Sequence, residues 1–429
     1  MKKSTKKHKI LMEGIYAFSM AGNFLAYHLS GLSRRRKNRL LFGAWGGNKY
    51  SDNPRFLFEK LHKMELSDTE LVWVGKEPLK DLEIFREPGA TVTFVKRNSL
   101  KSYYYQLTAD KAFFANSYRD FGVFNLLKGA VIVQLWHGFG LKNTQASKKN
   151  ISAMKKRYYR VGAKSFEKYD YFISSSPANT KKILESFQGN GITPEKIIPS
   201  GQPKNQFLIE MSKFGENKNT SKENFRYKLL KKYGIPQDKI LFTYLPTFRD
   251  HRETLTLSNL TGPEAEGLTE ALKEGGGVLL EKFHFADDIP YEPSKVHGIY
   301  RVDAKEDSTD LLLATDVLIT DYSSCYVDFT LLDRPIIHFL YDLEDYKTLD
   351  RGLYYPIEEY KGGPMAKDLQ ELFTYIGLAG SGDAPLETNP VFIPTARERV
   401  RRELMTYEKG QSTEVILKTL QIAEPQERK

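Results

Sequence analysis

The stretch from Leu311 to Tyr346 constrains the fold most, because it reads as strand, polar turn, helix and strand in immediate succession. Residues 317–319 form a short apolar run, which is typical of a strand covered on both faces. Residues 320–324, Thr-Asp-Tyr-Ser-Ser, place polar and hydroxyl-bearing side chains at its carboxyl end. A helix over 326–332 and a second apolar strand over 336–340 complete the unit.

The polar turn is also a candidate phosphate site. Ser323 or Ser324 can cap the helix that follows. A helix N-terminus offers unpaired N–H donors and a partial positive charge, both of which attract phosphate. An ordinary capped strand–turn–helix has the same local pattern, so this turn alone leaves the question of a ligand open.

Short apolar strands alternate with helices on both sides of a polar run at residues 214–224. Expected strands lie at 40–43, 71–74, 91–95, 111–115, 131–135 and 169–173 before it, and at 240–244, 277–280, 317–319 and 336–340 after it. This rhythm predicts an α/β protein of two doubly wound parallel sheets, with a cleft between them near residues 205–225.

Composition limits the class of protein. A chain of 429 residues is too long for one core, so two or three domains are expected. The single cysteine, Cys325, excludes an internal disulfide framework and fits a reducing cytoplasm. No secretory signal is expected, because no small-residue cleavage site follows a compact apolar region. The net charge of +10 is local, since the first 40 residues hold ten Lys and Arg against one acid.

Residues 12–32 lie within this basic arm and carry apolar side chains near helical spacing, among them Ile15, Phe18, Leu25 and Leu29. Polar interruptions leave the segment short of the ~20 apolar residues of a spanning helix. We expect an amphipathic helix on an anionic membrane surface; the alternative is a helix docked on the protein's own core with a solvated tail. Nucleic acid is not an expected partner, because basic and aromatic residues are not interleaved over a longer surface.

Further polar clusters follow other predicted strands, where ligands of parallel sheets bind. His137 follows one strand and is a candidate proton acceptor at neutral pH, although a structural imidazole bonded to backbone has the same pattern. Thr247 and Arg249 follow another; an Arg guanidinium can bind phosphate through two hydrogen bonds, or can simply lie on the surface. Lys282 and His284 follow a third and are a weak signal taken alone.

Two acidic residues, Asp321 and Asp328, could orient hydroxyls or imidazole rings in the same region, although Asp in such turns is often only a cap. The sequence contains no zinc-type Cys/His spacing, no P-loop lysine motif, no GxGxxG after the first strand and no GxSxG elbow. These absences weigh against metallohydrolase, kinase, dinucleotide-dependent dehydrogenase and lipase functions.

Several ordered motifs together resemble the CDP-glycerol glycerophosphotransferase family of teichoic acid synthesis. The motifs begin at Tyr50 (YSDNP), Gln134 (QLWHG), Gly201 (GQPKN), Tyr244 (YLPTFR) and Leu318 (LITDYSS). Shorter matches follow at Asp328-Phe329, Arg334-Pro335, Gly352-Leu-Tyr354 and Gly363-Pro364. Any one of these motifs is weak evidence, but their common order along the chain is specific.

The resemblance implies a GT-B-like fold of two doubly wound domains. It implies a basic, amphipathic membrane-association segment at 1–38 and an acceptor-side domain at 39–212. A CDP-alditol-binding domain at 213–395 and a C-terminal helix at 396–429, packing back on the first domain, complete the expected organisation.

The resemblance also implies roles for individual residues. His137 matches the family's proposed general base and His284 its second histidine, which is expected near the donor phosphates. The donor phosphates and nucleotide would be bound by polar residues of the second half, namely Thr247, Arg249, Lys282, Asp321, Ser323, Ser324 and Asp328. The acceptor side of the cleft would include Gly138, Lys142, Lys204 and Asn205.

The implied reaction moves glycerol phosphate or ribitol phosphate from a CDP-alditol to an undecaprenyl-linked saccharide or polymer hydroxyl, with release of CMP. It would take place at the cytoplasmic face of the cell membrane, on a peripheral protein, in synthesis of teichoic acid or a related cell-surface polymer. No metal or other cofactor is expected, because cationic side chains and a helix end can stabilise the phosphates. Whether the protein is a homo-oligomer is left open.

The chain departs from the family pattern at two places. Pro203-Lys-Asn-Gln206 stands where Pro-Arg-Asn-Asp is common, and Phe285 follows the second histidine where Pro is usual. These departures bear on the alditol and the acceptor more than on the reaction class. Two alternatives are a GT-B glycosyltransferase that uses a nucleotide sugar and a catalytically silent scaffold of the same fold.

Overall fold

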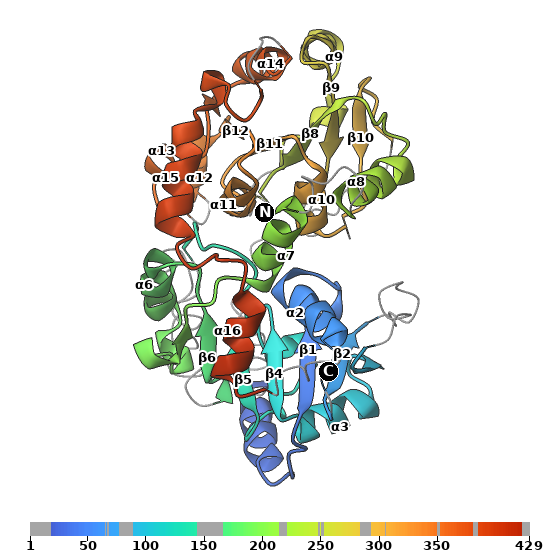
Figure 1. The fold of residues 1–429 in the computed structure, drawn as a ribbon. Coiled ribbons are helices and arrows are strands. Elements are labelled where there is room, and N and C mark those ends of the chain that lie inside the picture. Colours follow the sequence, from blue (N-terminus) through green and yellow to red (C-terminus); the bar gives the residue numbers. More distant parts are fainter. Residues whose placement is uncertain are drawn as a thin grey trace, which may run out of the picture.

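A computed structural model describes residues 19–64, 66, 68–76, 89–143, 166–213, 221–247, 249, 253–283, 293–304, 306–349, 352–380 and 385–422. In this part of the chain the strands form two sheets, each all-parallel and each flanked by helices (Figure 1). The expectation of an α/β protein with two such domains is confirmed.

The N-terminal sheet has seven strands in the order β3-β2-β1-β4-β5-β6-β7. They are β1 (Arg39–Gly43), β2 (Glu70–Gly75), β3 (Thr91–Lys96), β4 (Lys111–Phe114), β5 (Val131–Gln134), β6 (Tyr171–Ile173) and β7 (Ile197–Ile198). Its helices include α2 (Asp52–Lys63), α3 (Leu100–Thr108), α6 (Pro177–Ser186) and α7 (Pro203–Lys213).

The C-terminal sheet has six strands in the order β10-β9-β8-β11-β12-β13. They are β8 (Ile240–Leu245), β9 (Gly277–Glu281), β10 (Ile299–Arg301), β11 (Val317–Thr320), β12 (Ile336–Phe339) and β13 (Met365–Ala366). Its helices are α8 (Ser221–Lys232), α9 (Gly262–Glu274), α10 (Ser308–Ala314), α11 (Cys325–Phe329), α12 (Leu343–Leu349), α13 (Ile357–Tyr360), α14 (Leu369–Leu378) and α15 (Pro394–Leu404).

Apolar side chains on both faces of each sheet form the cores. In the N-terminal domain, Leu40 and Phe42 face one apolar cluster and Leu41 faces another, as the alternation along a strand requires. Helices on both faces cover these side chains, so β1 is buried along its whole length. Every residue of β11 is likewise buried.

The end of the chain crosses between the two domains. The expected single C-terminal helix is two helices: α15 contributes Val400 and Leu404 to a C-terminal core, and α16 (Ser412–Thr419) contributes Ile416 and Leu417 to an N-terminal one. Between them the backbone N–H of Tyr407 donates to the carbonyl of Ser175 at 2.8 Å. The crossing segment therefore ties both domains together beside the cleft.

Residues 19–30 are helical and rest on the N-terminal domain (Figure 1, dark blue). Met20 and Tyr27 pack against the apolar cluster of that domain, whereas Leu25 and Leu29 stay more than half exposed. The helix is thus docked through one side and leaves apolar side chains on another; the preceding residues 1–18 lie outside the described part of the chain. No helix among the described residues is long and apolar enough to cross a membrane.

Candidate functional site

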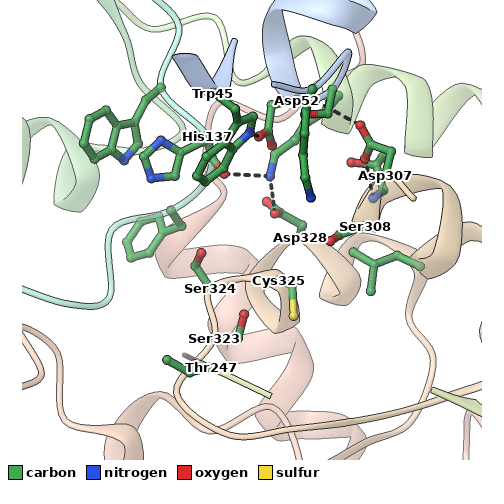
Figure 2. A pocket seen from close by; sticks show the side chains of 18 of the residues that line it. Trp45, Asp52, His137, Thr247, Asp307, Ser308, Ser323, Ser324, Cys325 and Asp328 are labelled. Carbon is green, nitrogen blue, oxygen red and sulfur yellow. Dashed lines mark hydrogen bonds and ion pairs between the residues drawn. The ribbon is translucent and has the colours of Figure 1, made fainter. Parts of the chain in front are cut away.

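A cavity of about 460 Å³ lies between the two domains, at the carboxyl ends of their strands (Figure 2). Nine of the thirteen site residues predicted from the sequence line it: His137, Gly138, Lys142, Lys204, Thr247, Lys282, Ser323, Ser324 and Asp328. Three described residues, Asn205, Arg249 and Asp321, are buried beside it instead. His284 lies outside the described residues, so its role stays a prediction.

His137 lies just past β5, between two indole rings. The ring centroids of Trp136 and Trp45 lie 4.1 Å and 5.3 Å from that of the imidazole. Nδ1 lies 3.3 Å from the carbonyl oxygen of Ala115, an acceptor, so we assign the proton to Nδ1. This tautomer leaves the lone pair of Nε2 available as a proton acceptor.

Burial lowers the pKa of His137 to about 4, and the nearby ammonium groups of Lys204, Lys182 and Lys142 add to the effect, against the opposing hydrogen bond to Ala115. The imidazole is therefore neutral at physiological pH. A neutral imidazole with an available Nε2 has the protonation state that a general base requires.

The next residue, Gly138, lies between the two domains at the cavity. Its φ of +146° is a conformation that L side chains rarely adopt. A Cβ here would also lie 3.1 Å from Oγ of Ser324 and 3.4 Å from Nζ of Lys204. A side chain at this position would fill the space between the imidazole and the serine turn.

The C-terminal side of the cavity carries several hydroxyl groups and one free thiol (Figure 2), beside charged residues such as Lys282, Asp307 and Asp328. Ser323 and Ser324 follow β11, but Ser324 occupies the N-cap position of α11 without a side-chain capping bond, unlike the cap expected from the sequence. The helix is also short, because α11 ends at Phe329 and a 3-10 turn continues to Leu332. At this turn, hydroxyl groups rather than a long helix dipole therefore face the cavity.

Lys142 reaches across the cavity, and residues 352–354 of the C-terminal domain hold the loop that carries it. Its ammonium donates to Oγ1 of Thr247 at 3.1 Å. In the same loop, the carbonyl of Leu141 accepts from the backbone N–H of Tyr354 at 2.7 Å, and Lys142 forms an antiparallel bridge with Leu353. The Gly352-Leu-Tyr354 motif noted in the sequence thus positions the loop that follows His137.

Arg249 has a different place from the one predicted. It is 2% exposed, and its guanidinium contacts Asp321 at 2.8 Å and Asp342 at 2.8 Å. Burial alone would lower its pKa, but the two carboxylates hold that pKa well above the ordinary value. We therefore correct the prediction of direct phosphate contact: Arg249 neutralises two buried acids beneath the site.

The prediction that Asp321 binds the donor phosphates or nucleotide is corrected for the same reason. Its carboxylate accepts the backbone N–H of Thr247 at 2.9 Å and 3.0 Å and is fully buried. It consequently fixes the turn after β8 against the turn after β11. Thr247 reaches the cavity because Asp321 holds its backbone.

Lys204 and Asp328 form a buried ion pair across the cleft, with Nζ and Oδ2 2.7 Å apart. Burial would lower the pKa of Lys204, but Asp328 and Asp52 raise it to about 12. Asn205 does not reach the cavity; its amide donates to Asp328 at 3.2 Å and to Glu408 of the crossing segment at 3.0 Å.

The cavity residues that the sequence analysis did not predict include Asp52 and Lys49. Asp52 follows the first loop, and its carboxylate accepts a hydrogen bond from the indole N–H of Trp45. The backbone N–H of Asp52 donates to the carboxylate of Asp307 in the other domain at 3.1 Å. Burial raises the pKa of Asp52 to about 6. Lys49 also lines the cavity, and burial lowers its pKa to about 8. The YSDNP motif was the available signal, because it placed an acid directly after a strand and loop.

The cavity also concentrates unusual backbone conformations. Trp45, Asp52 and Trp136 have positive φ angles of 49°, 60° and 54°, and all three line it. For residues other than glycine such conformations cost energy and are retained where the surrounding contacts fix them. The surrounding contacts thus fix the backbone of Trp45 and Trp136, and with it the position of the indoles beside His137.

Replacing Arg249 with Met is expected to reduce the free energy of unfolding by about 3–5 kcal/mol, because Asp321 and Asp342 would be left buried and unpaired. Denaturant unfolding measures the change. Arg399→Met is the control, since Arg399 is 48% exposed in its pair with Glu403 and should cost less than about 1 kcal/mol. If stability were unchanged and affinity for the donor were lost, Arg249 would instead contact the ligand directly.

A double-mutant cycle is expected to detect the pair across the cleft. Lys204→Ala and Asp328→Ala should each destabilise the protein by about 3–5 kcal/mol, and the double variant by clearly less than the sum. Denaturant unfolding of the four proteins gives the coupling energy. Strictly additive losses would show that the two charges do not stabilise each other.

Known proteins resemble this chain over nearly its whole length. A family model described as CDP-Glycerol:Poly(glycerophosphate) glycerophosphotransferase matches residues 25–421. A teichoic acid poly(glycerol phosphate) polymerase of Bacillus spizizenii is 28% identical over 384 residues, covering 86% of this chain and 89% of the relative. A teichoic acid glycerol-phosphate transferase of Staphylococcus aureus is 28% identical, covering 90% and 93%. A poly(ribitol-phosphate) polymerase of B. spizizenii is 26% identical, covering 82% and 52%.

Solved structures show the same fold. The wall teichoic acid polymerase TagF superposes with a TM-score of 0.74 at 21% identity, covering 96% of each chain. A UDP-GlcNAc 2-epimerase from Neisseria meningitidis is more distant, with a TM-score of 0.51 at 12% identity, covering 89% of this chain and 99% of that one. The two-domain arrangement is therefore the GT-B-like one.

Proposed function

The chain belongs to the CDP-glycerol:poly(glycerophosphate) glycerophosphotransferase family, and from that premise we propose the following reaction. The protein transfers glycerol phosphate or ribitol phosphate from a CDP-alditol to a hydroxyl of a lipid-linked or polymer acceptor in teichoic acid or related cell-surface polymer synthesis, and releases CMP. The observation that carries this proposal is His137, whose Nε2 is available on one wall of a cavity that Ser323, Ser324 and Thr247 line on the other.

In the proposed step, Nε2 of His137 accepts the proton of the acceptor hydroxyl as its oxygen attacks the β-phosphorus of the donor. A new phosphorus–oxygen bond forms, the bond from the β-phosphorus to the bridging oxygen breaks, and that oxygen leaves with CMP. The hydroxyls of Ser323, Ser324 and Thr247 and the ammonium of Lys282 donate toward the phosphate oxygens. Catalysis then rests on positioning and on charge stabilisation.

The cationic side chains of the cavity support the proposal that no metal is required. Lys49, Lys142 and Lys282 line it, together with Lys204 in its pair with Asp328. Ammonium groups can neutralise a diphosphate in the way a divalent cation would. Measuring CMP release with and without a chelator tests this point.

His137→Asn is expected to reduce kcat by at least about 10²-fold with the fold intact, because the variant keeps a polar side chain but has no basic nitrogen. CMP release from CDP-glycerol and from CDP-ribitol, with a lipid-linked acceptor, measures the effect and identifies the alditol. The exposed His297, which does not line the cavity, supplies the control variant His297→Asn.

Full activity of the His137→Asn variant would show that His137 is not the general base. If the unaltered protein released CMP from neither donor but bound a UDP-sugar, the nucleotide-sugar alternative would replace the proposed reaction. If it bound no nucleotide, the scaffold alternative would replace it.

We expect kcat/KM not to fall near pH 6.5 through protonation of His137. Because burial lowers the pKa of His137 to about 4, the imidazole stays a competent base until the pH falls toward that value. Profiles of kcat/KM from pH 4.5 to 8, with folding checked by circular dichroism, measure this in the free enzyme. An acidic limb near 6.5 that Lys204→Ala shifts upward would indicate a more solvated imidazole than the structure has.

We also propose that the protein is peripheral, at the cytoplasmic face of the cell membrane, and that it meets an anionic surface there. The basic first 40 residues support this, since exposed Lys and Arg are attracted to anionic headgroups and are screened by salt. The lipid-linked acceptor of the proposed reaction would be available at the same surface.

A further inference from the structure

The segment between β1 and α2 lies along the cavity and carries a hydrogen-bonded pair of side chains. Trp45 near its start and Asp52 at its end both line the cavity. The indole of Trp45 lies beside the imidazole of His137, with ring centroids 5.3 Å apart, and its Nε1–H donates to the carboxylate of Asp52. Figure 2 shows the indole between the imidazole and that carboxylate. Asp52 is therefore linked to the proposed base through one aromatic ring.

Contacts with the C-terminal domain fix the position of this segment. The backbone N–H of Asp52 donates to the carboxylate of Asp307 at 3.1 Å, and Nζ of Lys49 donates to the carbonyl of Ala304 at 2.6 Å. Asp52 also has a φ of 60°, which glycine adopts at no steric cost and which Asp and Asn tolerate better than most other residues. The carboxylate therefore extends from a backbone that both domains hold in place.

The indole of Trp45 covers one side of His137. The imidazole has Trp136 on another side, 4.1 Å away between ring centroids, and its Nδ1 faces the carbonyl of Ala115. Burial is the main cause of the lowered pKa of His137, about 4. An indole that turned away from the imidazole would admit water and raise that pKa toward the ordinary value of about 6.5.

We propose that Asp52 is a positioning residue for His137: its carboxylate holds the indole of Trp45 against the imidazole, and so keeps the imidazole oriented and shielded from water. Asp52 acts through the indole and needs no contact with the reacting atoms. Only the catalytic consequence of this inference rests on the proposed function, because the ionisation of the imidazole is a property of the protein without substrate. A carboxylate that merely stabilised the segment would leave that ionisation unchanged.

The contact between Asp52 and Trp45 does not depend on the charge of the acid. Burial raises the pKa of Asp52 to about 6, with Lys204 and Lys49 acting to lower it and Asp307 to raise it. A protonated carboxyl still has a carbonyl oxygen that can accept the indole N–H. The variant Asp52→Asn has such an oxygen without the charge, and it therefore imitates the protonated acid.

The test compares two substitutions of Asp52. Asp52→Gly removes the acceptor and suits a φ of 60°, whereas Asp52→Asn keeps an acceptor oxygen. Asp68→Gly is the matched control, because Asp68 has a φ of 56°, is exposed and does not line the cavity. Proton NMR titrates the imidazole of His137, whose signal is the one absent from His137→Asn, and thermal melting checks that each variant is folded.

In Asp52→Gly the pKa of His137 should rise from about 4 toward the ordinary value of about 6.5, because water reaches the ring. Loss of the negative charge alone would lower that pKa, so a rise cannot come from the charge. Lys204, Lys182 and Lys142, whose charges face the imidazole, are present in every variant. Asp52→Asn and the control should keep the low pKa. With the position of the base loosened, kcat should fall about tenfold in Asp52→Gly and less than about threefold in Asp52→Asn.

A variant of the other partner tests whether Asp52 acts through the indole. Trp45→Phe keeps a ring beside the imidazole but has no N–H donor, so it should also raise the pKa of His137 and lower kcat. Adding Asp52→Gly to Trp45→Phe should then change little more, because the hydrogen bond is already lost. Losses of kcat that multiply in the double variant would show that Asp52 acts by another route, and the proposal would be wrong.

Two further results would overturn the proposal. One is an unchanged pKa of His137 in folded Asp52→Gly, or in Trp45→Phe if Asp52→Gly does not fold. The other is a loss of kcat in Asp52→Asn as large as in Asp52→Gly, because charge rather than position would then be what matters. The titration uses the protein without substrate, so absence of CMP release from the unaltered protein would contradict the proposed reaction and leave the NMR result to decide the role of Asp52.

Discussion

The shape of the site depends on one buried ion pair, between Lys204 in the first turn of α7 and Asp328 in α11. Each residue belongs to a different domain, and both are less than a tenth exposed. Asn205 and Glu408 extend the contact to the crossing segment, and burial raises the pKa of Glu408 to about 7. A buried charge without its partner is expensive, so this pair favours a single arrangement of the two walls of the cavity.

Beneath that pair, a second charged cluster fixes the C-terminal wall. Arg249, Asp321 and Asp342 follow three different strands and neutralise one another. Tyr322 donates to Asp342 at 3.0 Å and lies under the guanidinium, so the turn that leads to Ser323 is held from below. The hydroxyls that face the cavity are therefore positioned by residues that do not line it.

The sequence predicted ten of the described strands because apolar runs bounded by polar turns mark them. It missed β7, β10 and β13, which have two or three residues each and are too short to show a period. Strand ends located His137, Lys282, Ser323 and Ser324 correctly at one cavity, since all strands of a parallel sheet point the same way. Residue type could not distinguish a phosphate ligand from a buried counter-ion at Arg249, because that distinction depends on contacts between distant turns.

The short first strand separates the basic arm from the cavity. Residues 34–37 of the basic arm lead into the amino end of β1, and Trp45 beyond its carboxyl end lines the cavity. The five residues of β1 span about 17 Å at the usual rise of ~3.3 Å per residue. The basic residues and the cavity therefore lie at opposite ends of this strand, roughly that far apart. Groups bound at the basic residues and groups bound in the cavity would therefore not compete for space.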